Sequence, residues 1–330
     1  MPAAPVLAAG LALTSVLLAS PISAALAGAR WTRRAPAAAL VLWQAVGLAS
    51  GLSLVGAGLV LALEPLGDTL ITGLRRWWDG LLAGDALARM TGHGIVTGTL
   101  STFVALILFG VLIRSAVLAV RRRRAHRMVL DLLTGDRSWA AGAGNVPAVR
   151  DRGVGELLAD VRILDHSTAV AYTLPGWHWR IVLSAGMVDL LDRDELVAVI
   201  DHERAHVRSR HDLLVLPFQA WATAVGWLPG VRAAGRSVAE LTEMLADDWA
   251  IRRSTPAVLA KALATVALAG VSESGLPGSQ TPAVTGRAVS ARVERLLRPQ
   301  PLPRWQLIFV YVAAIVLLAV PAVPFFVGWS

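Results

Sequence analysis

Four long apolar runs constrain the fold of this chain more than any other feature of its sequence. They cover about residues 6–29, 37–63, 95–120 and 305–329. As a helix rising about 1.5 Å per residue, each is long enough to cross a bilayer core about 30 Å thick. Hydrophobic residues make up 55% of the chain and charged residues only 16%, which argues against an ordinary soluble protein. The sequence therefore predicts a mainly α-helical membrane protein with about four transmembrane helices.

The first run contains Pro21 and has an alternative interpretation as a secretory signal peptide. A signal peptide carries positive charges before its apolar core, and no Lys or Arg precedes this run. We therefore expect a retained helix. The second run contains four glycines that suit close packing of helices in lipid, or that reflect only an Ala/Gly-rich composition: Gly47, Gly51, Gly56 and Gly58.

Arginine clusters beside the apolar runs predict the orientation of the chain in the membrane. Arg30, Arg33 and Arg34 lie between the first and second runs, and residues 121–127 carry further arginines after the third. Because positively charged loops stay in the cytoplasm, we expect both chain ends and residues 64–94 on the outer side. The same rule accounts for the net charge of +8 without nucleic acid as a direct partner.

The spacing of the runs predicts three parts. Residues 1–120 hold three transmembrane helices, residues 121–304 form a cytosolic catalytic domain, and residues 305–330 form the fourth transmembrane helix. Within the middle part, residues 167–174 and 180–184 are typical of two strands joined as a hairpin. A strand at the edge of a sheet can bind an extended peptide as one more strand, or the hairpin can serve only as part of the core.

Three further helices are expected in the middle part. Residues 213–228 are apolar but short and contain Pro217, which favours a buried or membrane-touching helix over a fifth span. Thr255 is expected to cap a helix over about residues 257–270. After a loose stretch, an amphipathic helix ends at residues 292–297.

The middle part contains the motif His202-Glu203-Arg204-Ala205-His206. On a helix, two histidines four residues apart lie on one face and can reach a single ion. A plausible helix start at Asp192 and apolar residues with helical spacing place the motif on a helix. This pattern indicates zinc-dependent peptide hydrolysis, in which two imidazoles hold the metal and the nearby carboxylate takes a proton from water.

A catalytic zinc site needs a third protein ligand and keeps one position open. The sequence contains no cysteine, so the ligands have to be histidine or carboxylate. We expect Glu243 as the third ligand and Asp247, one helical turn later, as the group that orients a ligand imidazole. Nearby Glu240 and Asp248 leave other carboxylates open as alternatives. A second alternative is that all these residues belong to a solvated, charged helix surface.

Glu203 is expected to act as the base that accepts a proton from water and later delivers it to the leaving amine. The group that stabilises the oxyanion is left open by the sequence. Four residues are possible donors, each also explicable as a structural residue: Arg208, His211, Arg252 and Tyr172. His166 and His178 have no partner at ligand spacing and are expected to be surface residues.

Taken together, these features resemble the membrane-embedded BlaR/MecR-type metallopeptidases, which are related in style to the HtpX and CAAX-protease group. The resemblance rests on the strand RIVLSAG, the helix DRDELVAVIDHERAH followed by RHD, the E-x-x-A-D at Glu243 to Asp247, the late RVERLL and the arrangement of spans. It implies an α+β zincin-like domain between spans three and four. It also implies Zn2+ ligands His202, His206 and Glu243, with Glu203 as base.

The resemblance further implies an integral-membrane endopeptidase of the cell membrane that cuts a cytosolic or membrane-proximal protein in regulated proteolysis and signal transduction. A BlaI-like transcriptional repressor is the candidate substrate. The antibiotic-sensing members carry a penicillin-binding domain after the last span, and this sequence ends at Ser330, so we expect a stimulus through residues 64–94, the lipid or another protein. Two alternatives remain: a quality-control protease for membrane proteins, and a non-catalytic receptor stabilised by zinc.

Overall fold

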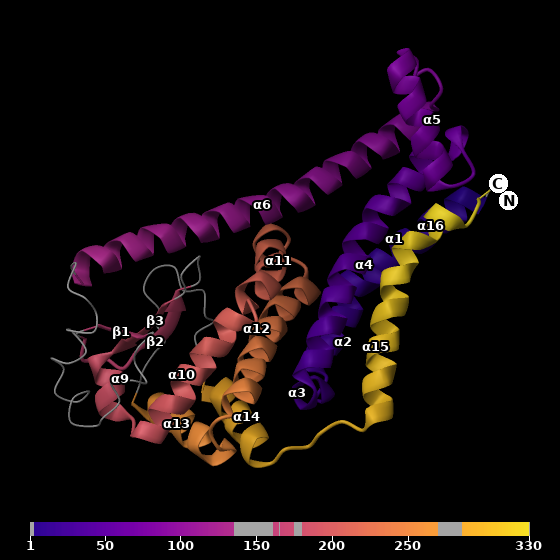
Figure 1. Ribbon diagram of the computed structural model, residues 1–330. Coiled ribbons are helices and arrows are strands. Elements are labelled where there is room, and N and C mark those ends of the chain that lie inside the picture. Colours follow the sequence, from indigo (N-terminus) through magenta and orange to yellow (C-terminus); the bar gives the residue numbers. More distant parts are fainter. Residues whose placement is uncertain (1–2, 135–160, 165, 175–179, 270–285, 330) are drawn as a thin grey trace. The chain divides into compact units, whose positions relative to one another are not determined.

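A computed structural model describes residues 3–134, 161–164, 166–174, 180–269 and 286–329 (Figure 1). The chain divides into two compact units. The first comprises residues 1–114, 217–237 and 302–330, and the second comprises residues 115–216 and 238–301. The division into three parts at residues 120 and 304 stays a prediction.

Four helical segments of the described chain are long and apolar enough to cross a membrane, as predicted: Ala3–Gly28, Pro36–Leu66, Gly92–Arg121 and Arg304–Phe326. The first consists of α1 (Ala3–Leu17), a π-helical turn over Leu18–Ile22, and α2 (Ser23–Gly28). Pro21 lies inside the π-helical turn. Because proline lacks an N–H and its ring collides with the carbonyl one turn earlier, the wider turn allows the helix to continue past it.

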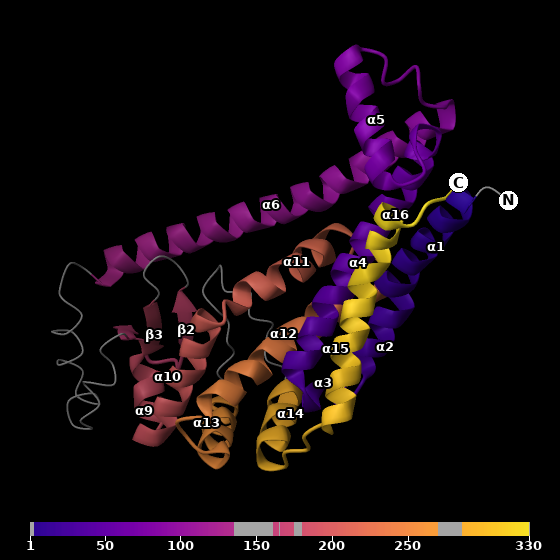
Figure 2. The ribbon, with the colours of Figure 1, turned by 45° about the vertical axis from the view of Figure 1, so that its right-hand side comes forward.

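The helix α4 (Pro36–Leu63) has α1 on one side and α15 (Arg304–Ala319) on another (Figure 2). Its glycines face neighbouring elements, and the approach is closer at Gly58 than at Gly56. A Cβ atom at Gly56 would lie 3.6 Å from Leu11 of α1, and one at Gly58 would lie 3.1 Å from the carbonyl oxygen of Thr97 in α6 (Gly92–Thr134). A side chain at Gly58 would therefore push α4 and α6 apart, whereas a Cβ atom at Gly56 would make an ordinary van der Waals contact.

The segment between the second and third spans forms α5 (Leu70–Ala83), which begins at a capping box between Thr69 and Thr72 and ends at Gly84 with φ 79°. At the other end of the chain, α15 is followed by a 3-10 turn (Val320–Ala322) and the short α16 (Val323–Phe326). The prolines in these two short elements explain the interruption of the helix. Short α3 (Trp31–Arg34) links the first two spans.

The first unit also includes a helical hairpin made by the second part of α11 (His211–Ala224) and the first part of α12 (Pro229–Ala250). The ring of Phe218 packs edge-to-face against Trp43 of α4, with centroids 6.3 Å apart. Gly230 approaches the π-helical turn so closely that a Cβ atom there would lie 2.7 Å from Cα of Ser20. The apolar segment over residues 213–228 is helical as far as Ala224 and is not among the four candidate spans.

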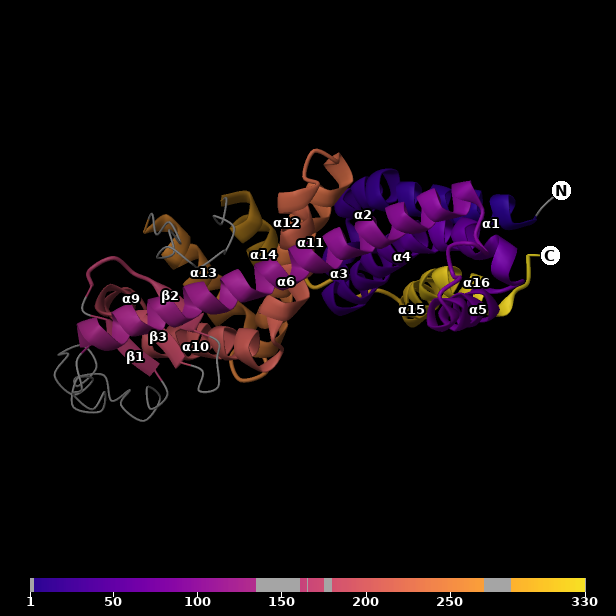
Figure 3. The ribbon, with the colours of Figure 1, turned by 90° about the horizontal axis from the view of Figure 1, so that it is seen from above.

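The second unit is built on a three-stranded sheet of β1 (Val161–Leu164), β2 (Ala171–Leu174) and β3 (Arg180–Ser184), seen from above in Figure 3. Their order is β1-β3-β2, with β1 parallel and β2 antiparallel to β3. The two predicted strands are confirmed, although β2 is shorter than predicted and β1 was not predicted. The connection over residues 175–179, with His178, lies outside the described residues.

Two helices follow the sheet directly. After α9 (Ala185–Leu190), α10 (Arg193–Arg208) begins where predicted, because Asp192 caps it and forms a reciprocal capping box with Glu195. The buried core between the sheet, α9, α10 and α13 (Pro256–Leu268) is apolar and includes Ile181, Leu183, Val188, Leu196, Ile200 and Ala262. This core fixes the face of α10 that carries the motif.

A second buried cluster joins α10, α12, α13 and α14 (Gly286–Leu297), through Ala198, Ala250, Leu259 and Leu296 among others. The predicted cap of α13 is confirmed, since Oγ1 of Thr255 accepts a hydrogen bond from the N–H of Val258. The loose stretch before α14 lies outside the described residues. This second cluster holds α12 and α14 against the helix that carries the motif.

Candidate metal centre

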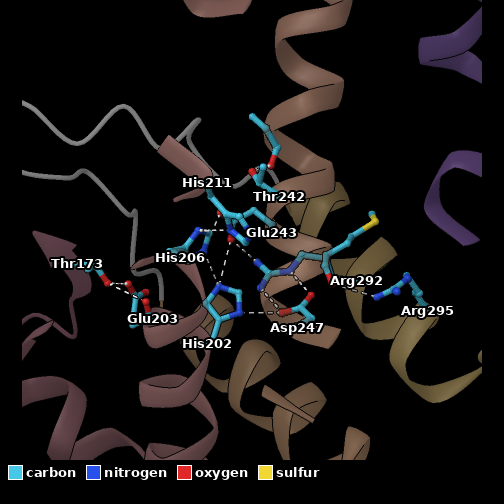
Figure 4. A network of polar contacts seen from close by, with 12 residues as sticks. Thr173, His202, Glu203, His206, His211, Thr242, Glu243, Asp247, Arg292 and Arg295 are labelled. Atoms are coloured by element: carbon cyan, nitrogen blue, oxygen red, sulfur yellow. Dashed lines mark hydrogen bonds and ion pairs between the residues drawn. The ribbon is translucent and has the colours of Figure 1, made fainter. Parts of the chain in front are cut away.

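Three side chains from two helices converge at one point in the second unit (Figure 4). His202 and His206 lie one turn apart on α10, and Glu243 projects from α12. Nε2 of His202 lies 3.2 Å from Nε2 of His206, and the two nitrogens lie 3.4 Å from Oε2 and Oε1 of Glu243, respectively. The structure therefore brings together the three residues that the sequence singled out.

The spacing of these donor atoms fits zinc. Nitrogen and carboxylate ligands lie about 2.0–2.2 Å from zinc, so two ligands of a tetrahedral ion are about 3.3–3.5 Å apart. The two Nε2 atoms are 3.2 Å apart, and each lies 3.4 Å from one oxygen of Glu243, Oε2 for His202 and Oε1 for His206, so all three distances are close to this edge. Two imidazoles and one carboxylate are also a donor set that zinc accepts. Three ligands leave the fourth position of a tetrahedron for water or substrate.

His202 is oriented by a carboxylate on its far side. Its Nδ1 atom lies 3.0 Å from Oδ1 of Asp247, one turn after Glu243 on α12. Both residues are buried. Because Nδ1 faces an acceptor, Nε2 is left to face the centre with its lone pair, which is the arrangement that a ligand imidazole requires.

His206 is oriented by a second histidine. Its Nδ1 atom lies 3.0 Å from Nδ1 of His211, the first residue of α11. Burial lowers the pKa of His211 to about 3, so its imidazole is neutral and can accept the proton on Nδ1 of His206. The chain turns sharply before α11, with Arg210 at φ 47° in the left-handed region. This rarely adopted conformation brings His211 back onto the motif helix.

Glu203 projects from α10 toward the sheet and meets β2. Its Oε2 atom lies 2.6 Å from Oγ1 of Thr173. Burial raises the pKa of Glu203, whereas the charge on His202 and the Thr173 hydroxyl act in the opposite direction. Glu203 is thus a carboxylate with raised basicity beside the cluster of donor atoms.

Two arginines of α14 face the carboxylates of α12. Arg292 donates to Oδ2 of Asp247 through Nε, at 2.8 Å, and to Oδ1 through Nη2, at 2.6 Å. Its Nη1 atom lies 3.3 Å from Oε2 of Glu243. One turn later, Arg295 pairs with Asp248 at 2.6 Å. Asp248 is therefore engaged away from the three donor atoms.

Electrostatics within this buried group favour charged carboxylates. Burial alone would raise the pKa of Glu243, but nearby His206, His202 and Arg292 hold it well below its usual range. Burial lowers the pKa of His202, yet its contacts with Asp247 and Glu243 outweigh that and raise it to about 10. Burial lowers the pKa of His206 to about 4. Without metal, a proton on His202 therefore balances the carboxylates around it.

The four residues left open as oxyanion donors lie in different surroundings. Arg208 stacks over the ring of Trp249, with 5.1 Å to its centroid, and His211 contacts His206. Arg252 is exposed. Tyr172 packs with Val182, and because successive side chains of a strand alternate, it points away from the face that carries Thr173. His166 is exposed, as expected.

The sequence did not assign roles to Thr173 or Arg292, which the structure brings to the site. Arg292 belongs to the RVERLL motif that carried part of the resemblance, and Thr173 lies in a predicted strand. From the sequence, His211 is expected only as one of the possible oxyanion donors. His211 follows His206 by five residues and lies beyond the end of α10. This spacing is the feature of the sequence that indicates a contact with the far side of the His206 imidazole.

Comparison with known families adds an independent finding. Residues 157–272 match the sequence model described as peptidase family M48. The match lies between the third and fourth candidate spans and includes both histidines of the motif and Glu243. No curated protein and no solved structure matches the chain significantly. The finer likeness to BlaR/MecR-type enzymes stays a prediction.

Proposed function

Because residues 157–272 form a zinc metallopeptidase domain of family M48, we propose that this membrane protein hydrolyses peptide bonds at the cytoplasmic surface of the cell membrane. The four candidate spans support the membrane location. The arginine clusters at residues 30–34 and 121–127 support the orientation, since such clusters stay on the cytoplasmic side. In this proposal, residues 121–304 are the cytosolic part.

His202, His206 and Glu243 hold the zinc ion in this proposal. The bound ion supplies Lewis acidity, which lowers the pKa of a water molecule and polarises the scissile carbonyl. Asp247 and His211 hold the two imidazoles in the tautomers that leave each Nε2 free to bind. The observation that carries the proposal is the convergence of the two Nε2 atoms and the Glu243 carboxylate, with contacts of 3.2 to 3.4 Å among them.

Glu203 moves the proton. Burial raises the pKa of its carboxyl group, which makes the carboxylate a stronger base. Its carboxylate accepts a proton from the attacking water and later donates it to the nitrogen of the leaving amine. The Thr173 hydroxyl fixes the direction of the carboxylate through Oε2.

The substrate is an extended polypeptide that pairs with β2. Among the described strands, β2 lies at the edge of the sheet, with β3 on its other side. Its residue Thr173 contacts Glu203, so a peptide that adds to this edge runs beside the motif helix. Main-chain hydrogen bonds along the edge bind any extended sequence. This explains how a peptidase recognises peptide backbone.

The enzyme acts in regulated proteolysis, with a cytosolic or membrane-proximal protein such as a BlaI-like repressor as its substrate. Comparing proteins in cells that carry wild-type enzyme with those in cells that carry Glu203→Gln tests this. A single uncut regulator in the variant supports the signalling role. Accumulation of many damaged membrane proteins instead points to quality control.

The peptidase activity itself is tested with purified Glu203→Gln protein. The variant keeps the three donor residues, so it is expected to bind zinc with wild-type stoichiometry and lose peptide hydrolysis. Asp194→Asn is the matched control, because Asp194 is an exposed carboxylate in the first turn of the same helix. Unchanged hydrolysis by Glu203→Gln would contradict the proposed role of Glu203.

Orientation is tested with single cysteines, because the natural chain contains none. Glu294 is exposed on α14 and Ser209 is exposed at the end of α10. We expect a cysteine at either position to be protected from a membrane-impermeant maleimide in intact cells and labelled after lysis. Labelling in intact cells would place the peptidase domain on the outer side.

A further inference from the structure

Arg292 is an almost fully buried cation, with a side chain that is 5% exposed. A buried guanidinium is costly unless its donors are paired, and here Nε and Nη2 bind both oxygens of Asp247 in a two-point contact. The carboxylate of Asp247 is fully buried. This pair links α14 to α12 across 45 residues of sequence.

The same guanidinium also touches the carboxylate of the third donor residue. Nη1 of Arg292 lies 3.3 Å from Oε2 of Glu243, whereas Oε1 of Glu243 lies 3.4 Å from Nε2 of His206. Oε2 of Glu243 therefore lies between Arg292 and Nε2 of His202, which is 3.4 Å away, and Oε1 faces the second histidine. Arg292 thus contacts both carboxylates that α12 sends to the site (Figure 4).

We propose that Arg292 is a positioning residue that holds the carboxylate of Glu243 beside both imidazoles and locks Asp247 behind His202. By engaging Oε2, the guanidinium fixes the direction of the Glu243 carboxylate, whose two oxygens face His202 and His206. By engaging Asp247, Arg292 also fixes the acceptor at Nδ1 of His202. The inference rests on the proposed zinc site.

The neighbouring ion pair offers a matched control. Arg295 lies one turn after Arg292 on α14, and its Nη2 atom lies 2.6 Å from Asp248, the residue after Asp247. Asp248 is engaged by Arg295 and is not one of the three grouped donor residues. If an ion pair between α14 and α12 only stabilises the fold, Arg295→Met should lose this contribution as Arg292→Met does. A contribution to the metal site is lost only in Arg292 variants.

The test compares wild type, Arg292→Lys, Arg292→Met and Arg295→Met as purified full-length proteins. Zinc affinity is measured by competition with a chelator, and coordination is measured by visible absorption after Co2+ replaces zinc. We expect Arg292→Met to bind zinc about 10- to 100-fold more weakly, as is typical when a group that holds a metal ligand is removed. Its Co2+ bands should change, because Glu243 and Asp247 lose the group that fixes their directions. Arg295→Met should keep wild-type affinity and bands.

Arg292→Lys keeps the charge but has no planar fork, so it should fold even if Arg292→Met does not. It should restore part of the zinc affinity, and its Co2+ bands should still differ from those of the wild type. Wild-type affinity and bands in both Arg292 variants would overturn the inference, as would equal losses in Arg292→Met and Arg295→Met. Failure of the wild-type protein to bind zinc would instead overturn the proposed zinc site.

Discussion

The hydroxyl oxygen of Thr173 on β2 lies 2.6 Å from Oε2 of Glu203 and 3.1 Å from the carbonyl oxygen of the same residue on α10. One side chain thus ties the edge strand to the proposed base. A hydrogen bond to the ionised carboxylate favours the ionised form and opposes the effect of burial on the pKa of Glu203.

Replacing Thr173 by valine should therefore raise the pKa of Glu203 further. Because the base acts when ionised, kcat/KM should begin to fall at a higher pH as the solution is acidified, and kcat at neutral pH should decrease. The pH profile of peptide hydrolysis checks this. Thr173→Ser should restore the wild-type profile, and Thr168→Val, in an exposed loop, serves as control. If kcat/KM of Thr173→Val falls on acidification at the same pH as that of the wild type, the prediction is contradicted.

Zinc affinity should rise with pH by about tenfold per unit between about pH 5 and 9. His202 has a pKa of about 10 and carries a proton over this range, whereas His206, with a pKa of about 4, is already neutral. Zinc therefore displaces about one proton from the ligands. Calorimetry in buffers with different ionisation enthalpies measures the number released. A flat dependence, or two protons from the imidazoles, would contradict this assignment.

The same proton predicts the pH dependence of the metal-free fold. The pKa of His202 is raised above its ordinary value of about 6.5, so the stabilisation is fully present below that pH and is lost as the pH rises through about 10. The melting temperature of metal-free protein should fall over this interval. His202→Gln should flatten that part of the curve.

Replacing His211 by leucine should weaken zinc binding by about 10- to 100-fold, because Nδ1 of His206 loses its acceptor. His211→Asn should recover part of the affinity, since its amide oxygen can accept the same proton. His166→Leu is the control, because His166 is exposed and its imidazole contacts the backbone of Thr168. Competition with a chelator measures all three. Equal zinc affinities in wild type and His211→Leu would contradict the proposed role of His211 in orienting His206.

Replacing Gly230 by alanine should destabilise the protein by about 1–3 kcal/mol, because the added methyl group collides with the backbone of Ala19 and Ser20. Gly10→Ala in α1 is the matched control, since a Cβ atom there meets nothing within 4 Å. Thermal unfolding in detergent compares the two. A melting temperature for Gly230→Ala equal to that for Gly10→Ala would show that the hairpin does not pack on the first span as described.

The elements that the sequence predicted carry strong local patterns. The four spans follow from long apolar runs, and the start of α10 follows from the reciprocal capping of Asp192 and Glu195. The pairing of His202 and His206 follows from helix geometry alone. Such features depend on neighbours within a few residues, so they can be recognised without a tertiary structure.

The remaining features depend on contacts between distant parts of the chain. Strand β1 is only four residues long and gains its identity by pairing with β3. Thr173 reaches Glu203 across 30 residues, and Arg292 reaches Asp247 across 45. No local spacing distinguishes these side chains from ordinary polar residues of a strand or an amphipathic helix. Their roles could be found only once the helices were packed.

The order of the site residues along the chain has a consequence for biosynthesis. Both imidazoles of α10 leave the ribosome before Glu243 of α12, and Arg292 of α14 follows later still. A nascent chain that has exposed only the histidine pair lacks the carboxylate needed to complete the ion's coordination. Newly made enzyme is therefore harmless to the proteins around it until most of its own translation is finished.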